Sequence, residues 1–177
     1  GVCAVAIAHW ALKAIFDYDE ADRANMFKKA SESPTGAGLG LIASARDCEV
    51  ICVVGCGTAV TIDVVDGMLH RGGYILPGLA LMESTLQRGT RKVRYDEGEA
   101  ANISLGVHTG AAVRNGALAA VVALIEKVAH GHAAKHVVLT GGDADIIATQ
   151  LAIPCEVDSA LLLKGMWRYF ENKHDPC

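Results

Sequence analysis

The sequence lacks several features that would assign it to a specialised class of protein. Its 177 residues contain no apolar run long enough to span a membrane. Basic residues are not in excess, since 16 Lys and Arg stand against 20 Asp and Glu and give a net charge of −4. We therefore expect no nucleic-acid partner and no membrane-binding surface.

The cysteine spacing also lacks the patterns that would indicate a zinc site or a disulfide framework. Six cysteines are present, at positions 3, 48, 52, 56, 155 and 177, and none forms a paired C-x-x-C motif. Cys48, Cys52 and Cys56 are spaced four residues apart, which would allow a metal site only if their side chains converged. The residues between them resemble a strand, where such side chains lie too far apart to share one metal easily. We predict reduced core thiols in a cytoplasmic protein.

The start of the chain lacks an initiator Met and the basic segment that opens a signal peptide. We therefore expect a fragment or a processed product. Hydrophobic residues make up 51% and charged residues 20%, so the composition predicts a folded domain with a sizeable core.

The most informative stretch is V-V-G-C-G-T-A-V-T-I-D-V-V-D-G, residues 53–67. Two apolar, β-branched runs flank a turn that contains glycine, which predicts an antiparallel hairpin. Thr58, Thr61 and Asp63 are polar where a core strand is usually apolar. Because successive backbone N–H groups in such a turn can hold anionic oxygens, we interpret it as a phosphate-holding loop. An ordinary hairpin, whose hydroxyls bond its own backbone, is the alternative.

Hydrophobic periodicity predicts a mixed-sheet α/β domain with the element order β-β-β-α-α-β-α-β-α. The strands are expected at residues 49–54, 60–65, 68–75, 135–139 and 153–157, and the helices at 79–87, 109–129, 144–151 and 160–170. Further helices are expected at residues 2–16 and 41–45. Thr109 is expected at the N-cap of the longest helix, where its hydroxyl would accept a backbone hydrogen bond.

Three other segments are open to more than one interpretation. The basic segment 88–95 suits a solvated loop, or contact with an anionic substrate. His130, His132 and His136 suggest a metal cluster, but no acid or cysteine lies at ligand spacing beside them, so a solvated helix C-terminus is favoured. The glycine-rich residues 36–40 do not follow a strand and favour a linker.

The turn at T-G-G-D-A, residues 140–144, follows a strand and precedes a helix. Its glycines would let the backbone approach the sugar and base of a nucleotide, whereas a plain tight turn is the alternative.

Four motifs, taken together and in order, resemble the type III pantothenate kinases, the family that includes the Bvg accessory factors. They are G-C-G-T-A-V-T-I-D, G-G-Y-I-L-P-G-L, G-V-H-T-G-A-A-V-R-N-G and T-G-G-D-A, which begin at Gly55, Gly72, Gly106 and Thr140. The resemblance covers roughly residues 41–165 and is strongest to the C-terminal half of that family.

The resemblance implies a ribonuclease-H-like, actin-like ATPase fold with an incomplete N-terminal domain. Residues 1–40 would be a remnant of that domain or a helical leader, and residues 41–177 the C-terminal kinase domain. It also implies an enzyme that transfers the γ-phosphoryl group of ATP to the 4′-hydroxyl of pantothenate in coenzyme A synthesis. Mg²⁺ and a monovalent cation, K⁺ or NH₄⁺, would be the other cofactors.

The resemblance implies roles for particular residues. Gly57, Thr58 and Asp63 would belong to the second phosphate-binding motif. Thr140, Gly141 and Gly142 would form the adenosine motif, and Thr109 would contact pantothenate. A homodimer would form through the segment from Gly73 to Gly78 and the helix that follows.

The sequence also departs from the family pattern. The Asp-x-Gly-Asn-Thr motif of the family's first strand has no counterpart. The catalytic Asp of a Gly-x-Asp-Arg segment is absent from residues 36–40, and Asp22-Arg23 lies in a different context. Gly55 occupies the position of the Asp that binds the monovalent cation. We therefore leave the catalytic base unassigned. The loss of a general base would lower the rate of phosphoryl transfer by about 10²–10⁴-fold.

Two other functions remain open. The chain could be a catalytically impaired homologue that acts as a regulatory or binding module. It could also be a nucleotide-binding α/β domain with a different phosphoryl acceptor.

Overall fold

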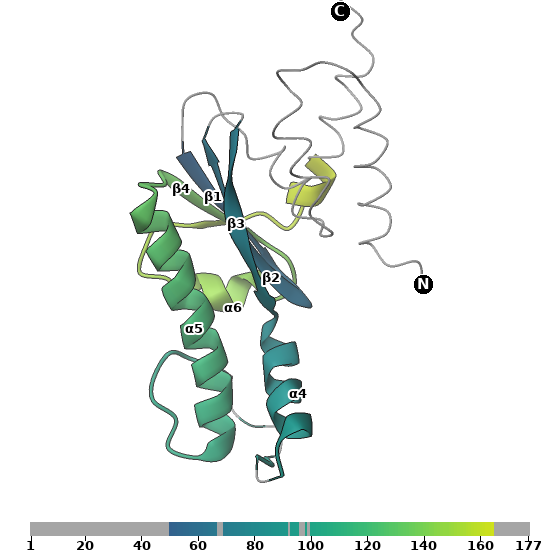
Figure 1. The fold of residues 1–177 in the computed structure, drawn as a ribbon. Helices are drawn as coiled ribbons and strands as arrows, with labels where there is room; N and C mark the ends of the chain where they lie inside the picture. The colour runs from purple at the N-terminus through teal and green to yellow at the C-terminus, as the bar shows by residue number, and fades with distance from the viewer. Residues whose placement is uncertain (1–49, 67–68, 92, 96–97, 99, 165–177) are drawn as a thin grey trace, which may run out of the picture.

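The computed structural model describes residues 50–66, 69–91, 93–95, 98 and 100–164, and these form one mixed sheet with flanking helices (Figure 1). The strands are β1 (Val50–Cys56), β2 (Ala59–Asp66), β3 (Leu69–Pro77), β4 (His136–Thr140) and β5 (Glu156–Val157). The helices are α4 (Leu79–Gly89), α5 (Thr109–Gly131) and α6 (Ala144–Ala148). Residues 161–164 are also helical. The predicted element order is confirmed over this range.

The sheet has the order β3-β2-β1-β4-β5. β1, β2 and β3 form an antiparallel meander, whereas β4 pairs parallel to β1 and β5 parallel to β4. This combination of strand order and direction is the ribonuclease-H-like arrangement that the resemblance implied. The expected helices at residues 2–16 and 41–45, the glycines at 36–40, the first domain at 1–40 and Cys48 lie outside the described residues.

One face of the sheet packs against the helices to form the main core. Alternate residues of β1 and β2 point to this face, as the two-residue period of a strand requires. They meet apolar side chains of α5 that are fully buried, including Leu118, Val121 and Ile125. Figure 1 shows α5 lying along the sheet and continuing beyond it beside α4.

The other face of β1 and β2 is buried as well, which explains the continuous apolar run in the sequence. Ile51, Val53 and Val65 are each at most 2% exposed on this face. The buried polar residues Thr61 and Asp63 alternate with the residues that face the helices. Because both faces are buried, the run could predict a core strand but not which face would carry polar groups.

The structure also corrects details of the predicted elements. Thr109 is not the N-cap of α5. His108 takes this position, and its Nδ1 accepts a hydrogen bond from the Ala111 N–H at 3.3 Å. α6 ends at Ala148 rather than at residue 151. Thr149 is its C-cap, and the Thr149 hydroxyl donates a hydrogen bond to Ile146 O at 2.8 Å. β5 starts after Pro154, which has no N–H for a sheet.

The cysteine prediction is confirmed for two core residues. Cys52 and Cys56 are free and at most 1% exposed. Burial raises the pKa of each thiol to about 12, with repulsion from Asp63 and from Asp143, respectively, as a further cause. Both are therefore thiols at neutral pH, packed as small apolar side chains.

Within the described part of the chain, no helix combines the length and apolar character needed to cross a membrane.

Candidate functional site

A pocket of about 270 Å³ opens where two turns of the sheet meet the start of a helix. Its walls are the β1–β2 turn, the first turn of α4 and the β4–α6 turn. The lining residues are Cys56, Gly57, Thr58, Ala80, Leu81, Gly142 and Asp143. Three of the predicted site residues, Gly57, Thr58 and Gly142, therefore lie around one cavity although 84 positions separate the last two in sequence (142 − 58).

The β1–β2 turn presents Gly57 and Thr58 at the surface. The turn is closed by a hydrogen bond from Gly57 N–H to Ala59 O at 3.1 Å. On its other side, Gly78 N–H donates to Thr58 O at 2.8 Å. A Cβ atom on Gly78 would collide with the carbonyl oxygen of Gly57, so only glycine allows this close approach.

The contact with Gly78 brings the positive end of α4 to the pocket. The first hydrogen bond of this helix runs from Met82 N–H to Gly78 O at 2.9 Å, so the N–H groups of residues 79–81 have no partner within the helix. No side chain caps the helix, and its first turn contains no acidic residue. N–H groups without a partner in the helix, together with the helix dipole, favour a bound anion, and Ala80 and Leu81 line the pocket.

The β4–α6 turn also lines the pocket, through Gly142 and Asp143. Gly141 has φ +110°, and a Cβ atom there would collide with Cys56 O, so glycine is required on both counts. The Asp143 N–H also donates to Cys56 O, at 3.2 Å. Gly142, in contrast, is exposed with open space beside its Cα, because an added Cβ would meet no atom within 4 Å.

Asp143 contributes the one carboxylate among the residues that line this pocket. It occupies the N-cap of α6, yet its side chain makes no capping hydrogen bond. The carboxylate is close enough to the Cys56 thiol to help raise its pKa. The pocket thus combines backbone N–H groups, a hydroxyl and a single carboxylate.

The remaining predicted site residues lie elsewhere. Thr140 ends β4 and is paired with Gly55 of β1, while Gly141 packs closely on the backbone of Cys56. Thr109 is exposed at the start of α5. None of these three is a lining residue of the pocket.

Asp63 lies within the sheet, on the face opposite the helices. It is 8% exposed, and its Oδ1 is 2.8 Å from Nε2 of His70, which is 9% exposed. Gly73 of β3 is its partner in register, and a Cβ there would lie 2.5 Å from Asp63 Oδ1. In this structure, therefore, Asp63 has a hydrogen-bond partner and is not a lining residue of the pocket.

Within the basic segment, two positions are engaged in local structure. Arg94 donates to the backbone oxygens of Thr90 and Val93, both at 2.8 Å, and also to that of Gln87 at the end of α4. The Tyr95 hydroxyl donates to Glu83 Oε2 at 3.3 Å. Of the two interpretations of this segment, these contacts favour the solvated loop.

The three histidines show no metal site. His130 lies in the last turn of α5, His132 is its C-cap, and both are exposed. Among the described residues, no group of three or more His, Cys, Asp or Glu side chains is arranged to hold a metal ion.

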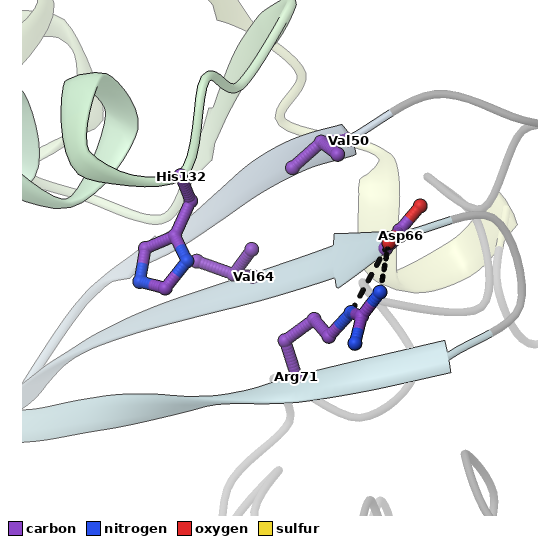
Figure 2. A pocket seen from close by; sticks show the side chains of 5 residues that line it. All are labelled: Val50, Val64, Asp66, Arg71 and His132. Carbon is purple, nitrogen blue, oxygen red and sulfur yellow. Dashed lines mark hydrogen bonds and ion pairs between the residues drawn. The ribbon is translucent and has the colours of Figure 1, made fainter.

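A second pocket, of about 350 Å³, lies at the opposite end of the β1–β2 hairpin (Figure 2). Its charged residues are already paired, because Arg71 Nε and Nη2 lie 3.1 and 2.5 Å from Asp66 Oδ2. His132 projects from the end of α5, and Val50 and Val64 complete the lining. The negative end of the α5 dipole and the ion pair make this pocket a poorer anion site than the first.

Comparison with known proteins agrees with the fold. The family model for type III pantothenate kinase matches residues 37–131. A type III pantothenate kinase of Psychrobacter cryohalolentis is 42% identical over 121 residues, which are 68% of this chain and 50% of that protein. The chain belongs to the type III pantothenate kinase family.

Other relatives agree with this assignment. A type III pantothenate kinase of Acinetobacter baumannii is 38% identical over 76% of this chain and 55% of its own length. The chain thus spans about half the length of the curated relatives that it matches. A crystal structure from Campylobacter jejuni, described as a conserved Baf family transcriptional activator, has the same fold, with a TM-score of 0.67 and 22% identity over 92% of this chain and 71% of that one.

The monovalent-cation site implied by the type III pantothenate kinase resemblance does not fit the residues of this chain. Gly55 supplies no carboxylate where that resemblance places an Asp. A Cβ atom on Gly55 would lie 2.7 Å from Thr61 Oγ1, which is closer than such atoms normally approach. Thr61 therefore occupies the space into which a side chain at position 55 would extend.

The sequence interpretation missed four residues that line this pocket: Cys56, Ala80, Leu81 and Asp143. Asp143 was visible within the T-G-G-D-A motif, but nothing in the sequence distinguished it from a helix cap. Ala80 and Leu81 have apolar side chains, which do not indicate a binding site in the sequence. They would contribute to the pocket through their backbone N–H groups at the start of α4. Only the contact between Gly78 and Thr58 reveals them.

Proposed function

We propose that this chain carries the ATP-binding part of a type III pantothenate kinase, which transfers the γ-phosphoryl group of ATP to the 4′-hydroxyl of pantothenate in coenzyme A synthesis. The observation that carries the proposal is the pocket at which the Gly57–Thr58 turn meets the uncapped N-terminus of α4. Family membership supplies the choice of substrates. We place this activity in the cytoplasm, in keeping with the reduced core thiols.

In this proposal, the phosphate groups of ATP bind at the Thr58 hydroxyl and the free N–H groups of α4. Phosphoryl transfer depends mainly on positioning and on stabilising charge, both of which suit fixed backbone dipoles. Thr140, Gly141 and Gly142 would shape the adenosine side, and Thr109 would contact pantothenate. The assignment of Asp63 to phosphate binding stays a prediction.

Magnesium would be held mainly by the phosphate oxygens of ATP, with the Thr58 hydroxyl as a protein ligand, and would neutralise charge on the transferred group. The monovalent cation has no place in the proposed site, because Gly55 and Thr61 do not fit it. No residue of the described chain is assigned to accept the proton of the pantothenate hydroxyl.

A homodimer is part of the proposal. Among the residues that the structure describes, β3 is an edge strand, and its Tyr74 and Ile75 are 56% and 59% exposed. Leu81 and Leu86 of the following helix are also more than two-fifths exposed. Exposed apolar side chains on an edge strand and on the helix that follows it favour a protein contact, and the second copy of the chain is the partner that we propose.

The test is ATP-dependent phosphorylation of pantothenate by the purified chain, alongside equilibrium binding of ATP. Thr58→Ala should weaken ATP binding by about 10- to 100-fold, as expected for the loss of a hydrogen bond to a charged group. Thr85→Ala is the matched control, because Thr85 lies on α4 outside the lining of the pocket and donates to Leu81 O at 2.7 Å.

A second candidate, a catalytically impaired binding module, is favoured by the lack of a carboxylate at Gly55. ATP binding that depends on Thr58 but gives no phosphorylated pantothenate would support this alternative. Absence of both ATP binding and turnover would contradict both candidates. Full activity in Thr58→Ala would show that the phosphate loop is wrongly assigned.

A further inference from the structure

The Asp143 carboxylate is available to a ligand in a way that most aspartates at helix starts are not. An N-cap Asp normally accepts a hydrogen bond from a backbone N–H of the first turn. Here that bond is absent, although the Asp143 main chain is held by its N–H bond to Cys56 O at 3.2 Å. The backbone is therefore fixed while the side chain, which lines the pocket, keeps its acceptors uncommitted.

Charge decides which part of a nucleotide could lie beside this residue. A carboxylate repels phosphate oxygens, whereas the N-terminus of α4 and the β1–β2 turn attract them. The two kinds of group come from different segments of the pocket lining, because Thr58 belongs to the β1–β2 turn, Ala80 and Leu81 belong to α4, and Gly142 and Asp143 belong to the β4–α6 turn. A bound nucleotide would thus place its phosphates toward Thr58.

The groups next to the phosphates in a nucleoside triphosphate are the ribose hydroxyls. A carboxylate has two oxygens that accept hydrogen bonds, and vicinal hydroxyls provide two donors. Gly142 leaves open space beside Asp143 in which a sugar can lie. A Cβ at this position would narrow that space.

We propose that Asp143 recognises the ribose of the bound nucleotide by accepting hydrogen bonds from its 2′- and 3′-hydroxyls, so that the site selects ribonucleotides. This inference rests on the proposed ATP-binding function and adds a specificity-determining residue to it. Asp143 takes no part in the transfer of the phosphoryl group.

The experiment compares equilibrium binding of ATP, 2′,3′-dideoxyATP and magnesium tripolyphosphate by the full chain. The unmodified protein should bind ATP about tenfold more tightly than the dideoxy analogue, the effect of hydrogen bonds to a charged acceptor. Asp143→Asn and Asp143→Ala should lose this preference and bind tripolyphosphate at least as tightly as before. Asp145→Asn is the matched control, because Asp145 is exposed on α6 and does not line the pocket.

The inference is overturned if the unmodified chain binds both nucleotides equally, a result that needs no variant to fold. It is also overturned if the Asp143 variants keep the preference, or if they lose affinity for magnesium tripolyphosphate as much as for ATP, which would make the carboxylate a metal ligand. Binding of ATP without sugar preference refutes this inference alone. A chain that binds no ATP refutes the proposed function as well.

Discussion

At Gly55, any side chain would have to share space with the Thr61 hydroxyl. The two residues are partners in the β1–β2 register, and Thr61 is 4% exposed. We expect Gly55→Ala to lower the free energy of unfolding by about 1–3 kcal/mol, the usual cost of overpacking a buried site. Urea denaturation monitored by circular dichroism measures this change.

The same position allows a control by double-mutant cycle. Thr61→Ala removes the opposing hydroxyl, so Gly55→Ala should cost much less in that background. Equal costs with and without Thr61 would show that the contact does not limit position 55. This cycle also tests our explanation of why the implied cation site does not fit this chain.

Besides packing in the core, α5 fixes the loop that precedes it, through Asn115 in its second turn. Asn115 is 7% exposed. Its Oδ1 accepts from Asn102 N–H at 3.2 Å, and its Nδ2 donates to Ser104 O at 2.9 Å. The loop fixed in this way leads directly to His108 and Thr109, so α5 sets the position of its own N-terminus.

Asn115→Ala should therefore destabilise the chain by about 1–3 kcal/mol, since it leaves partly buried backbone groups unpaired. Hydrogen exchange of the Asn102 amide should accelerate at the same time. Asn115→Asp is the informative companion, because it retains the acceptor for Asn102 N–H but loses the donor to Ser104 O. Unchanged exchange at Asn102 in the alanine variant would contradict this account of the loop.

At the scale of the whole molecule, the edge of the sheet determines how two copies could associate. Ile75→Lys adds a charge to the exposed part of β3, and a charge on an edge strand opposes further strand or apolar contacts. We expect this variant to be monomeric, and the unmodified chain dimeric, in sedimentation equilibrium at the same concentration.

Leu163→Lys serves as the control, because Leu163 is 65% exposed in the helical residues 161–164. The substitution adds the same charge to a residue outside β3 and α4. It should leave the dimer intact. A monomeric unmodified chain, or a dimer that tolerates lysine at position 75, would contradict the proposed interface.

Much of the fold was predictable, because its signals are local. Two β-branched runs around a glycine turn predicted the hairpin, and a wide apolar face predicted α5 from residue 109. Errors occurred at element ends, where a particular hydrogen bond decides the boundary. His108 displaced Thr109 as the cap because its ring nitrogen reaches the Ala111 N–H, and no residue pattern predicts that choice.

The candidate site was predictable only in part. Glycines and a hydroxyl in two motifs indicated Gly57, Thr58 and Gly142, since those residue types allow backbone and ligand to approach closely. By contrast, the structure gives Asp63 a partner in His70 and leaves Thr109 exposed at the start of α5. The motif order could not separate these outcomes, because a motif does not state which face of a strand its polar residues occupy.

By itself, the sequence determined the family and the order of the elements, since these depend on residue types and local spacing. The tertiary structure decided that Gly78 rests on Thr58, that the N-terminus of α4 opens into the same pocket, and that Asp143 faces this pocket unpaired. These relations join β1, β3, β4 and two helices across the sheet. They arise from strand register and packing between distant segments, which no local pattern in the chain specifies.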